Sequence, residues 1–270
     1  VECSAGLSAY EETGNPLPEE TIQAIEEHRV ALKGPLTTPV GTGFRSVNVA
    51  LRQKFHLYSN IRPAQTLPSI DSAFKNVNMV IFRENTQGLY IGKEQWVDED
   101  EKNHAESIAV VTEEASKKII TSAFEYARAH DRKKVTLVHK ANILKFTTGL
   151  FLEVGREVAK AFPEIEFEDL IVDNMAMQMV MRPQRFDVVV TANLFGDILS
   201  DQCAGLSGSL GLLPSASLGE NDFGLYEPAG GTAPDLVGKN KATPLAQIHS
   251  LSLLLRYSLR KGDAAFLIER

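Results

Sequence analysis

The chain has 270 residues, enough for one large domain or two modest ones. Its hydrophobic fraction of 43% is typical of a globular protein, and no apolar run approaches 18 residues, so no membrane span is indicated. The net charge of −7 argues against nucleic acid as a partner, and two widely separated cysteines, Cys3 and Cys203, favour a reducing compartment without disulfides.

The first forty residues combine an unusual start with a loop suited to a polar ligand. Val1–Cys3 has neither an initiator methionine nor a signal or transit peptide, and it has the pattern of the middle of a strand. We therefore expect the chain to begin inside a larger fold. A helix over 18–28 and a strand over 30–32 lead to the glycine-, proline- and threonine-rich loop 33–43. Neither G-x-G-x-x-G nor G-x-x-x-x-G-K-[ST] occurs, so a dinucleotide would not bind in the Rossmann manner.

Four arginines then indicate an anion with more than one carboxylate. Ser46 is a plausible N-cap of a helix over 45–52, and Asn48, Arg45 and Arg52 lie beside it. A surface helix with solvated arginines is the alternative for this segment. Strands over 56–61 and 77–82 would place Arg62 and Arg83 just past their ends, where α/β folds bind ligands.

The middle of the chain alternates strands and helices, which predicts the α/β class. Strands at 88–92 and 106–111 flank a charged turn and predict a hairpin arm of the kind that interlocks subunits. Helices over 112–130, 149–162 and 174–180 and strands over 135–138 and 167–172 follow, with Lys140 and Asp173 just beyond the strands. Lys140 could be a solvated terminus or a catalytic group.

The segment after the apolar strand 188–190 is the one on which the functional interpretation depends. If it is helical, Asp197 and Asp201 lie one turn apart on one face, where two unpaired carboxylates repel. A positive group between them is therefore expected, and a hard divalent cation is the obvious candidate. The alternative is that Asp197 caps the helix and Asp201 is solvated.

The last part of the chain holds a second loop rich in glycine and proline. It follows a strand over 223–226 and contains Gly230 and Gly231, which allow close backbone approach to a ligand. Asp235 could accept hydrogen bonds from ribose hydroxyls. The final helix over 245–259 is expected to pack as core.

The motifs LKGPLTTPVGTGFRSVNVALRQ, RPA, RENTQGLY, VHKANILK, NLFGDILSDQCAGL and GGTAPD stand here in the order of one family. The chain resembles the decarboxylating β-hydroxyacid dehydrogenases, which act on isocitrate, 3-isopropylmalate, homoisocitrate or tartrate/malate. RSVNVALR looks most like NAD-dependent isocitrate dehydrogenase, because isopropylmalate enzymes usually carry leucines there. The tail from LLPSAS onward looks more like isopropylmalate dehydrogenase.

The resemblance implies a role for each matching residue. Arg52, Arg62 and Arg83 would hold substrate carboxylates, with Ser46 and Asn48 on the γ-carboxylate of isocitrate and Arg45 less certain. Lys140 would take the hydroxyl proton and Tyr90 would protonate the enol carbon. Mg²⁺ or Mn²⁺ would act as a Lewis acid, bound by Asp173, Asp197 and Asp201. Lys140 and Asp173 would complete the site of the neighbouring subunit, so a homodimer would be the smallest active unit.

The resemblance also implies the cofactor and the domains. Asp235–Leu236 stands where NADP enzymes usually place lysine and tyrosine, and a carboxylate repels a 2′-phosphate, so NAD is expected. Gly230 and Thr243 depart from the histidine and asparagine usual in the family. The expected NAD contacts are Thr38, Asn142, Gly231, Thr232, Ala233, Asp235 and Thr243. Residues 1–57 and 208–270 would form the larger, nucleotide-binding domain without the family's first strand, and 58–207 the smaller dimerisation domain with an arm at 86–111.

Two other functions fit the same sequence. The chain could be a 3-isopropylmalate or homoisocitrate dehydrogenase, or a non-catalytic or regulatory subunit of an isocitrate dehydrogenase. Regulatory members usually lose the tyrosine, the lysine or a metal-binding acid, whereas Tyr90, Lys140 and the three aspartates all stand here. Catalysis is the interpretation we favour, in the cytoplasm or, in a eukaryote, the mitochondrial matrix.

Overall fold

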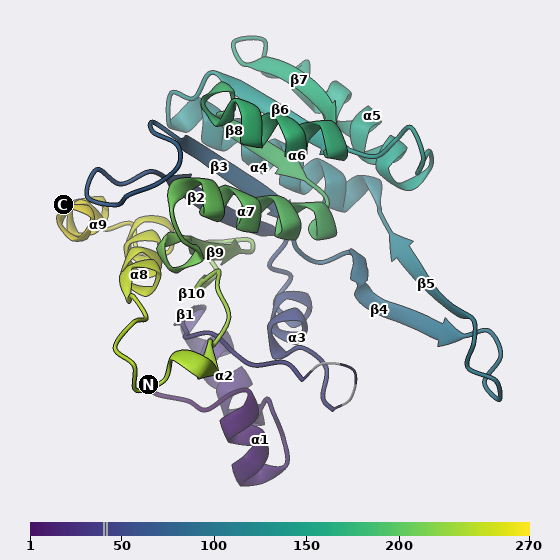
Figure 1. Cartoon of the computed structure of the whole chain (residues 1–270), viewed down its shortest axis with the longest axis vertical. Helices are drawn as coiled ribbons and strands as arrows, with labels where there is room; N and C mark the ends of the chain where they lie inside the picture. The colour runs from purple at the N-terminus through teal and green to yellow at the C-terminus, as the bar shows by residue number, and fades with distance from the viewer. Residues whose placement is uncertain (40, 42) are drawn as a thin grey trace.

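The computed structural model describes residues 1–39, 41 and 43–270, and these form a mixed α/β fold (Figure 1). The α/β class expected from the sequence is confirmed. Val40 and Thr42, within the predicted ligand loop 33–43, lie outside the described residues.

One sheet of eight strands runs through the described part of the molecule, in the order β1-β10-β9-β2-β3-β8-β6-β7. β3, β8, β6 and β7 pair in parallel, whereas β9 is antiparallel to both β10 and β2, and β2 is antiparallel to β3. The bounds are β1 Val30–Leu32, β2 Ser59–Gln65, β3 Asn78–Glu84, β6 Lys134–His139, β7 Glu166–Ile171, β8 Val188–Thr191, β9 Pro214–Leu218 and β10 Gly224–Pro228.

Helices cover both faces of this sheet because its central strands are apolar on both sides. One core joins β2, β3, β6 and β8 to α4 (Glu113–Ala129), α5 (Thr147–Ala159) and α8 (Leu245–Tyr257). The opposite core joins β3 and β8 to α6 (Val172–Met181) and α7 (Asn193–Ser207), which lie in front of the sheet in Figure 1.

A third, smaller core packs α2 (Glu19–His28) and α3 (Val47–Lys54) near β10. α1 (Leu7–Thr13) precedes these helices, and α9 (Gly262–Glu269) follows α8 at the other end of the chain. Three short 3₁₀ turns, η1 Pro183–Arg185, η2 Leu210–Leu212 and η3 Pro234–Leu236, complete the described elements.

The predicted hairpin arm is present. β4 (Gly88–Trp96) and β5 (Ala105–Val110) pair in antiparallel fashion and project away from the large sheet (Figure 1). Gln87 and Thr112 close the base of the arm, since the Thr112 backbone amide donates to Gln87 Oε1 at 2.9 Å.

Several boundaries differ from the sequence-based expectation. Arg62 was expected past a strand over 56–61 but lies inside β2, and Arg83 lies inside β3, because both strands continue further than their apolar runs. Val1–Cys3 was expected to be strand, yet these exposed residues pair with no strand in the described part of the chain. α1, α9 and β9 were not predicted at all.

β2 pairs with β9 through Ser59–Leu218, Asn60–Ser217 and Ile61–Ala216, so one sheet crosses the predicted boundary between the two domains. The division into 1–57 with 208–270 and 58–207 stays a prediction. Among the described residues, no helix combines the length and the apolar character that crossing a bilayer requires.

Candidate active site

A cavity of about 210 Å³ opens where α3, β2, β3, the arm, α7 and β10 meet. It is too small for a dinucleotide and suits a compact acid. The side chains expected to bind substrate all line it, together with Tyr90 and Asp197: Ser46, Asn48, Arg52, Arg62 and Arg83. Arg45, the fourth arginine of the sequence-based prediction, is exposed, and in the described part of the chain it lies outside this lining.

The first wall is the N-terminal turn of α3. Ser46 is the N-cap, as predicted, and its hydroxyl accepts from the Val49 amide at 3.4 Å. This cap orients the helix so that Asn48 and Arg52 reach the cavity. Asn48 Oδ1 and Arg52 Nε are buried and have no hydrogen-bond partner among the described residues. A ligand carboxylate would accept from Arg52 Nε, whereas Asn48 Oδ1 is an acceptor and would need a donor such as a hydroxyl group.

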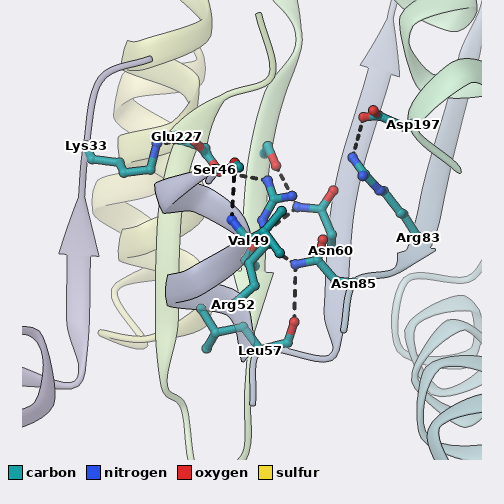
Figure 2. A network of polar contacts seen from close by, with 12 residues as sticks. Lys33, Ser46, Val49, Arg52, Leu57, Asn60, Arg83, Asn85, Asp197 and Glu227 are labelled. Carbon is teal, nitrogen blue, oxygen red and sulfur yellow. Dashed lines mark hydrogen bonds and ion pairs between the residues drawn. The ribbon is translucent and has the colours of Figure 1, made fainter. Parts of the chain in front are cut away.

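Arg52 is held from the other side by Glu227 of β10. Its Nη2 donates to Glu227 Oε1 at 3.0 Å, and Lys33 donates to the second carboxylate oxygen (Figure 2). Burial alone would raise the pKa of Glu227, but the charges of Lys33 and Arg52 hold it below its ordinary value. Burial in turn lowers the pKa of Lys33. The three groups form one buried charge cluster beneath the cavity.

Arg62 and Arg83 converge on Asp197 from neighbouring strands. Arg62 Nη1 lies 3.3 Å from Asp197 Oδ1. Arg83 makes a shorter ion pair with the same oxygen (Figure 2). Burial and the adjacent Arg62 lower the pKa of Arg83 to about 9, which leaves it protonated at neutral pH. Burial would raise the pKa of Asp197, yet the two arginines more than offset it, so that pKa is lowered. Asp197 therefore stays ionised.

The positive group expected between Asp197 and Asp201 is present in the protein itself. Arg62 Nη1 lies 3.3 Å from Asp197 Oδ1 and 3.8 Å from Asp201 Oδ1. The alternative in which Asp197 caps the helix is wrong, because α7 begins at Asn193 and its N-cap is Ala192. The Asp201 side chain is 55% exposed, and burial and the neighbouring Asp197 raise its pKa while Arg62 opposes the change.

Tyr90 reaches the cavity from β4 of the arm. Its hydroxyl donates to Asp197 Oδ2 at 2.7 Å, and its ring lies 5.0 Å from the Arg83 guanidinium carbon. Burial and the hydrogen bond to Asp197 raise the pKa of Tyr90. The phenol consequently keeps its proton at neutral pH and can act as an acid.

Lys140 and Asp173 lie elsewhere, at the ends of β6 and β7. They form an ion pair with each other, and hydrogen bonding from Lys140 lowers the pKa of Asp173. Within the described residues of one chain, neither lines the cavity that holds Tyr90, and no three acidic, histidine or cysteine side chains are close enough to hold a metal ion. One chain brings Asp197 and Asp201 together but leaves Asp173 apart.

A second cavity, of about 470 Å³, adjoins the first. The two share Pro35, Pro228, Gly230 and Gly231, so a ligand in one would face a ligand in the other. Of the expected NAD contacts, Gly231, Thr232, Ala233 and Thr243 line it. Thr38, Asn142 and Asp235 are exposed and, in the described part of the chain, lie outside both linings.

The walls of the second cavity fit a nucleotide. Its lining is more apolar than that of the first, as the flat face of a base requires, and includes Leu210, Leu236 and Ala246. Ala233 has a φ of 43°, a left-handed value that is rare outside glycine and is found at functional turns.

Sequence reasoning missed three residues that hold the site together. Glu227 pairs with Lys33 and Arg52, Asn60 accepts from Arg62 Nε at 2.8 Å, and Asn193 accepts from Arg83. An acid directly after the predicted apolar strand 223–226 was the available signal for Glu227. Asn60 and Asn193 gave none, because their sequence surroundings do not reveal which side chains they contact.

The sequence profile of the isocitrate/isopropylmalate dehydrogenase family matches residues 1–270, which is the whole chain. The chain belongs to this family. Its sequence is 57% identical to that of isocitrate dehydrogenase from Methylococcus capsulatus, for which a crystal structure is known. The two structures match with a TM-score of 0.97 over 99% of this chain and 79% of that one. The family and fold expected from the motifs are therefore confirmed.

The curated relatives carry more than one activity in their names. The chain is 48% identical to a mitochondrial NAD isocitrate dehydrogenase regulatory subunit from Dictyostelium discoideum, over 89% of this chain and 67% of the relative. It is 43% identical to the chloroplastic 3-isopropylmalate dehydrogenase of Solanum tuberosum, over 93% of this chain and 70% of the relative. The chain thus spans about two thirds of the length of these relatives.

Proposed function

We propose that this chain oxidises and decarboxylates isocitrate to 2-oxoglutarate with NAD and a divalent cation, Mg²⁺ or Mn²⁺. The observation that carries the proposal is the convergence of three buried arginines with Ser46 and Asn48 in one small cavity. Arginine forks bind carboxylates in a fixed geometry, so three of them in one cavity favour an anion that carries several carboxylates. A tricarboxylate is an anion of this kind.

Ser46 and Asn48 support isocitrate over isopropylmalate. Both polar side chains stand at the cavity wall beside Arg52, whose Nε is a buried donor without a partner among the described residues. A carboxylate placed there can accept from Arg52 Nε, the Ser46 hydroxyl and the Asn48 amide nitrogen, whereas an isopropyl group can accept from none of them and would leave buried donors unsatisfied, at a cost of about 1–3 kcal/mol each. Homoisocitrate, which is one methylene longer, is the closest competitor.

The donor groups present fit a hard divalent cation. Asp197 and Asp201 offer carboxylate oxygens one helical turn apart, and oxygen ligands are those that Mg²⁺ and Mn²⁺ prefer. Asp173 would supply a further carboxylate from a second copy of the chain. Bound there, the cation would act as a Lewis acid on the substrate oxygens. When substrate carboxylates take up Arg62 and Arg83, Asp197 is released for this role.

NAD fits the adjoining cavity. Gly231 has no neighbouring atom within 4 Å of its Cβ position among the described residues, so a ligand can approach its backbone closely. Because Gly231 lines both cavities, a substrate in one and NAD in the other would lie side by side. NAD would accept the hydride. Asp235 is exposed near this cavity, where its carboxylate would oppose a 2′-phosphate. Thr38 and Asn142 stay predicted contacts of the cofactor.

Two residues would move protons. The raised pKa of Tyr90 keeps its phenol protonated for delivery to the enol carbon after CO₂ leaves. Lys140 would take the substrate hydroxyl proton, but it lies outside the cavity formed by its own chain as the structure describes it. We therefore infer that Lys140 and Asp173 act in the site of a second copy.

The surface near these residues supports that inference. Phe146 is 93% exposed in the loop after Lys140, and Met177, Val180 and Met181 form an exposed apolar stripe on α6. Exposed apolar patches of this kind mark protein–protein contacts. A homodimer or higher oligomer with shared sites follows as the proposed assembly, in the cytoplasm or, in a eukaryote, the mitochondrial matrix.

A panel of substrates and cofactors tests the proposal. Purified protein with Mg²⁺ is assayed with isocitrate, homoisocitrate and 3-isopropylmalate, each with NAD and with NADP. We expect NADH and CO₂ from isocitrate only, and loss of turnover in a folded Asp201→Asn variant. NADH production from 3-isopropylmalate but not from isocitrate would overturn the substrate assignment.

The name of the Dictyostelium relative favours one alternative, in which the chain has a regulatory role. Such a chain would bind isocitrate in the arginine cavity without turnover. Calorimetry with isocitrate and Mg²⁺ separates the two functions: binding with no NADH under any condition supports the regulatory role.

A further inference from the structure

Asn193 occupies a position that no functional assignment above explains. It opens α7, is 2% exposed, and lies between Arg83 and the base of the arm. Its side-chain oxygen accepts from Arg83 Nε at 2.9 Å and from Arg83 Nη2 at 2.8 Å. Its side-chain nitrogen donates to the Gln87 backbone carbonyl at 3.0 Å.

The chemistry of the two neighbours fixes the orientation of this amide. A guanidinium group can only donate and a backbone carbonyl can only accept, so the Asn193 oxygen must face Arg83 and its nitrogen must face Gln87. A carboxylate could serve only the first contact, and an apolar side chain neither. The position therefore calls for an amide of this length.

The packing around Asn193 leaves little freedom for either neighbour. A Cβ at Gly196, one turn along α7, would lie 2.6 Å from Arg83 Cγ, so Arg83 is pressed against the helix. A Cβ at Gly88, the first residue of β4, would lie 3.4 Å from Asn193 Cβ. The Arg83 side chain and the first residue of β4 thus both pack against the first turn of α7.

Arg83 and the arm meet again inside the cavity. The Arg83 guanidinium lies over the ring of Tyr90, which is two residues beyond Gly88, and both side chains contact Asp197. Displacing the base of the arm would therefore move the Tyr90 hydroxyl relative to Arg83. A shift on the order of 1 Å at such a group can cost about 100-fold in rate.

We propose that Asn193 is a positioning residue that couples the arm to the substrate-binding arginine. Through one amide it fixes the spacing between Arg83, which would hold a substrate carboxylate, and the strand that carries Tyr90. The coupling between the arm and Arg83 is inferred from the hydrogen bonds of Asn193 alone. Its effect on turnover rests on the proposed function.

Two variants and one control test this inference. Asn193→Asp keeps an acceptor for Arg83 but removes the donor to Gln87, and a carboxylate is favoured at the start of a helix, so this variant is expected to fold. Asn193→Ala removes both contacts. Gln184→Glu is the matched control, because Gln184 Nε2 also donates to a backbone carbonyl, that of Lys75, at 2.9 Å, and neither residue lines the cavity.

The first readout needs no substrate. Amide hydrogen exchange of the assembled protein is followed over residues 86–92, with α4 as internal reference. We expect exchange at the arm base to rise roughly fivefold or more in both Asn193 variants, the equivalent of one lost hydrogen bond of about 1 kcal/mol, and not in Gln184→Glu. Unchanged exchange in Asn193→Asp would overturn the coupling.

The second readout separates positioning from general destabilisation. For Asn193→Ala we expect KM for isocitrate to rise about tenfold or more and kcat to fall, because Arg83 and the strand that carries Tyr90 both lose their support, while KM for NAD stays within about twofold. A lower kcat with both KM values unchanged would indicate a smaller folded fraction and would contradict the role. If the wild-type protein turns over no substrate of the panel, the proposed function fails, but the exchange result still decides the coupling.

Discussion

Glu227 shows at the residue scale how this site tolerates so many buried cations. It is 4% exposed and compensates both Lys33 and Arg52, while Asp197 compensates Arg62 and Arg83. A buried cation without a partner would carry a large desolvation cost. Each carboxylate therefore keeps two basic side chains charged and oriented before a ligand arrives.

Replacing Glu227 tests this explanation directly. Glu227→Gln leaves Lys33 and Arg52 buried without a counter-charge, so we expect the free energy of unfolding to fall by about 3–5 kcal/mol. Urea denaturation measures the change. Glu157→Gln, which breaks the exposed pair of Glu157 with Lys160, is the matched control and should shift stability by less than about 0.5 kcal/mol.

The same carboxylate predicts a pH dependence. Because the folded-state pKa of Glu227 is lowered from its ordinary value of 4.5, its stabilising contribution is fully present above that pH and is lost as pH falls below it. The difference in Tm between wild type and Glu227→Gln should therefore be constant from pH 7 to about 5.5 and shrink below about 4.5. A gap that widened in acid would contradict the assignment.

At the scale of elements, α7 is placed by contact with Arg83 of β3. Gly196 allows this close approach, because a Cβ there would lie 2.6 Å from Arg83 Cγ and 3.2 Å from its Cα. Gly205, on the same helix, is exposed and has no described atom within 4 Å of its Cβ position. The two glycines therefore share one helix and differ in the space around them.

Alanine at each glycine should have opposite effects. Gly205→Ala should stabilise the protein by about 0.5–1 kcal/mol through helix propensity. Gly196→Ala gains the same helix propensity but displaces the Arg83 side chain, which packs against Gly196. We therefore expect a net loss of about 1–3 kcal/mol in the free energy of unfolding, and weaker isocitrate binding. Chemical denaturation measures the free energy of unfolding of both variants. Equal values for the two would show that α7 does not pack as described.

At this scale, helices and strands with a strong local sequence pattern could be predicted from the sequence, whereas elements defined by tertiary contacts could not. The apolar strand 188–190 and the Ser46 cap were predicted because their signals are local. β9 was missed because Ser215 and Ser217 resemble a loop, yet both are buried, where the Asn60 amide donates to them at 2.7 and 3.0 Å. No local signal reports a partner more than a hundred residues away, which is also why Asn193 was missed.

At the scale of the whole molecule, the proposed site divides between two surfaces. The arginines, Tyr90, Asp197 and Asp201 gather at or beside one cavity, whereas Lys140 and Asp173 pair beside exposed apolar residues such as Phe146. The family motifs predicted both groups, but the spatial separation became visible only in the fold. Under the proposed mechanism, a second copy of the chain brings the groups together.

Mixing two inactive variants tests most directly whether two copies of the chain share an active site. Lys140→Ala and Tyr90→Phe are each expected to lose nearly all NAD-dependent oxidation of isocitrate. If the variants are unfolded and refolded together, about half of the dimers are hybrids, and each hybrid holds one intact site. We expect recovery of about a quarter of wild-type activity. A refolded mixture of hybrids that stays as inactive as the separate variants would contradict the shared site.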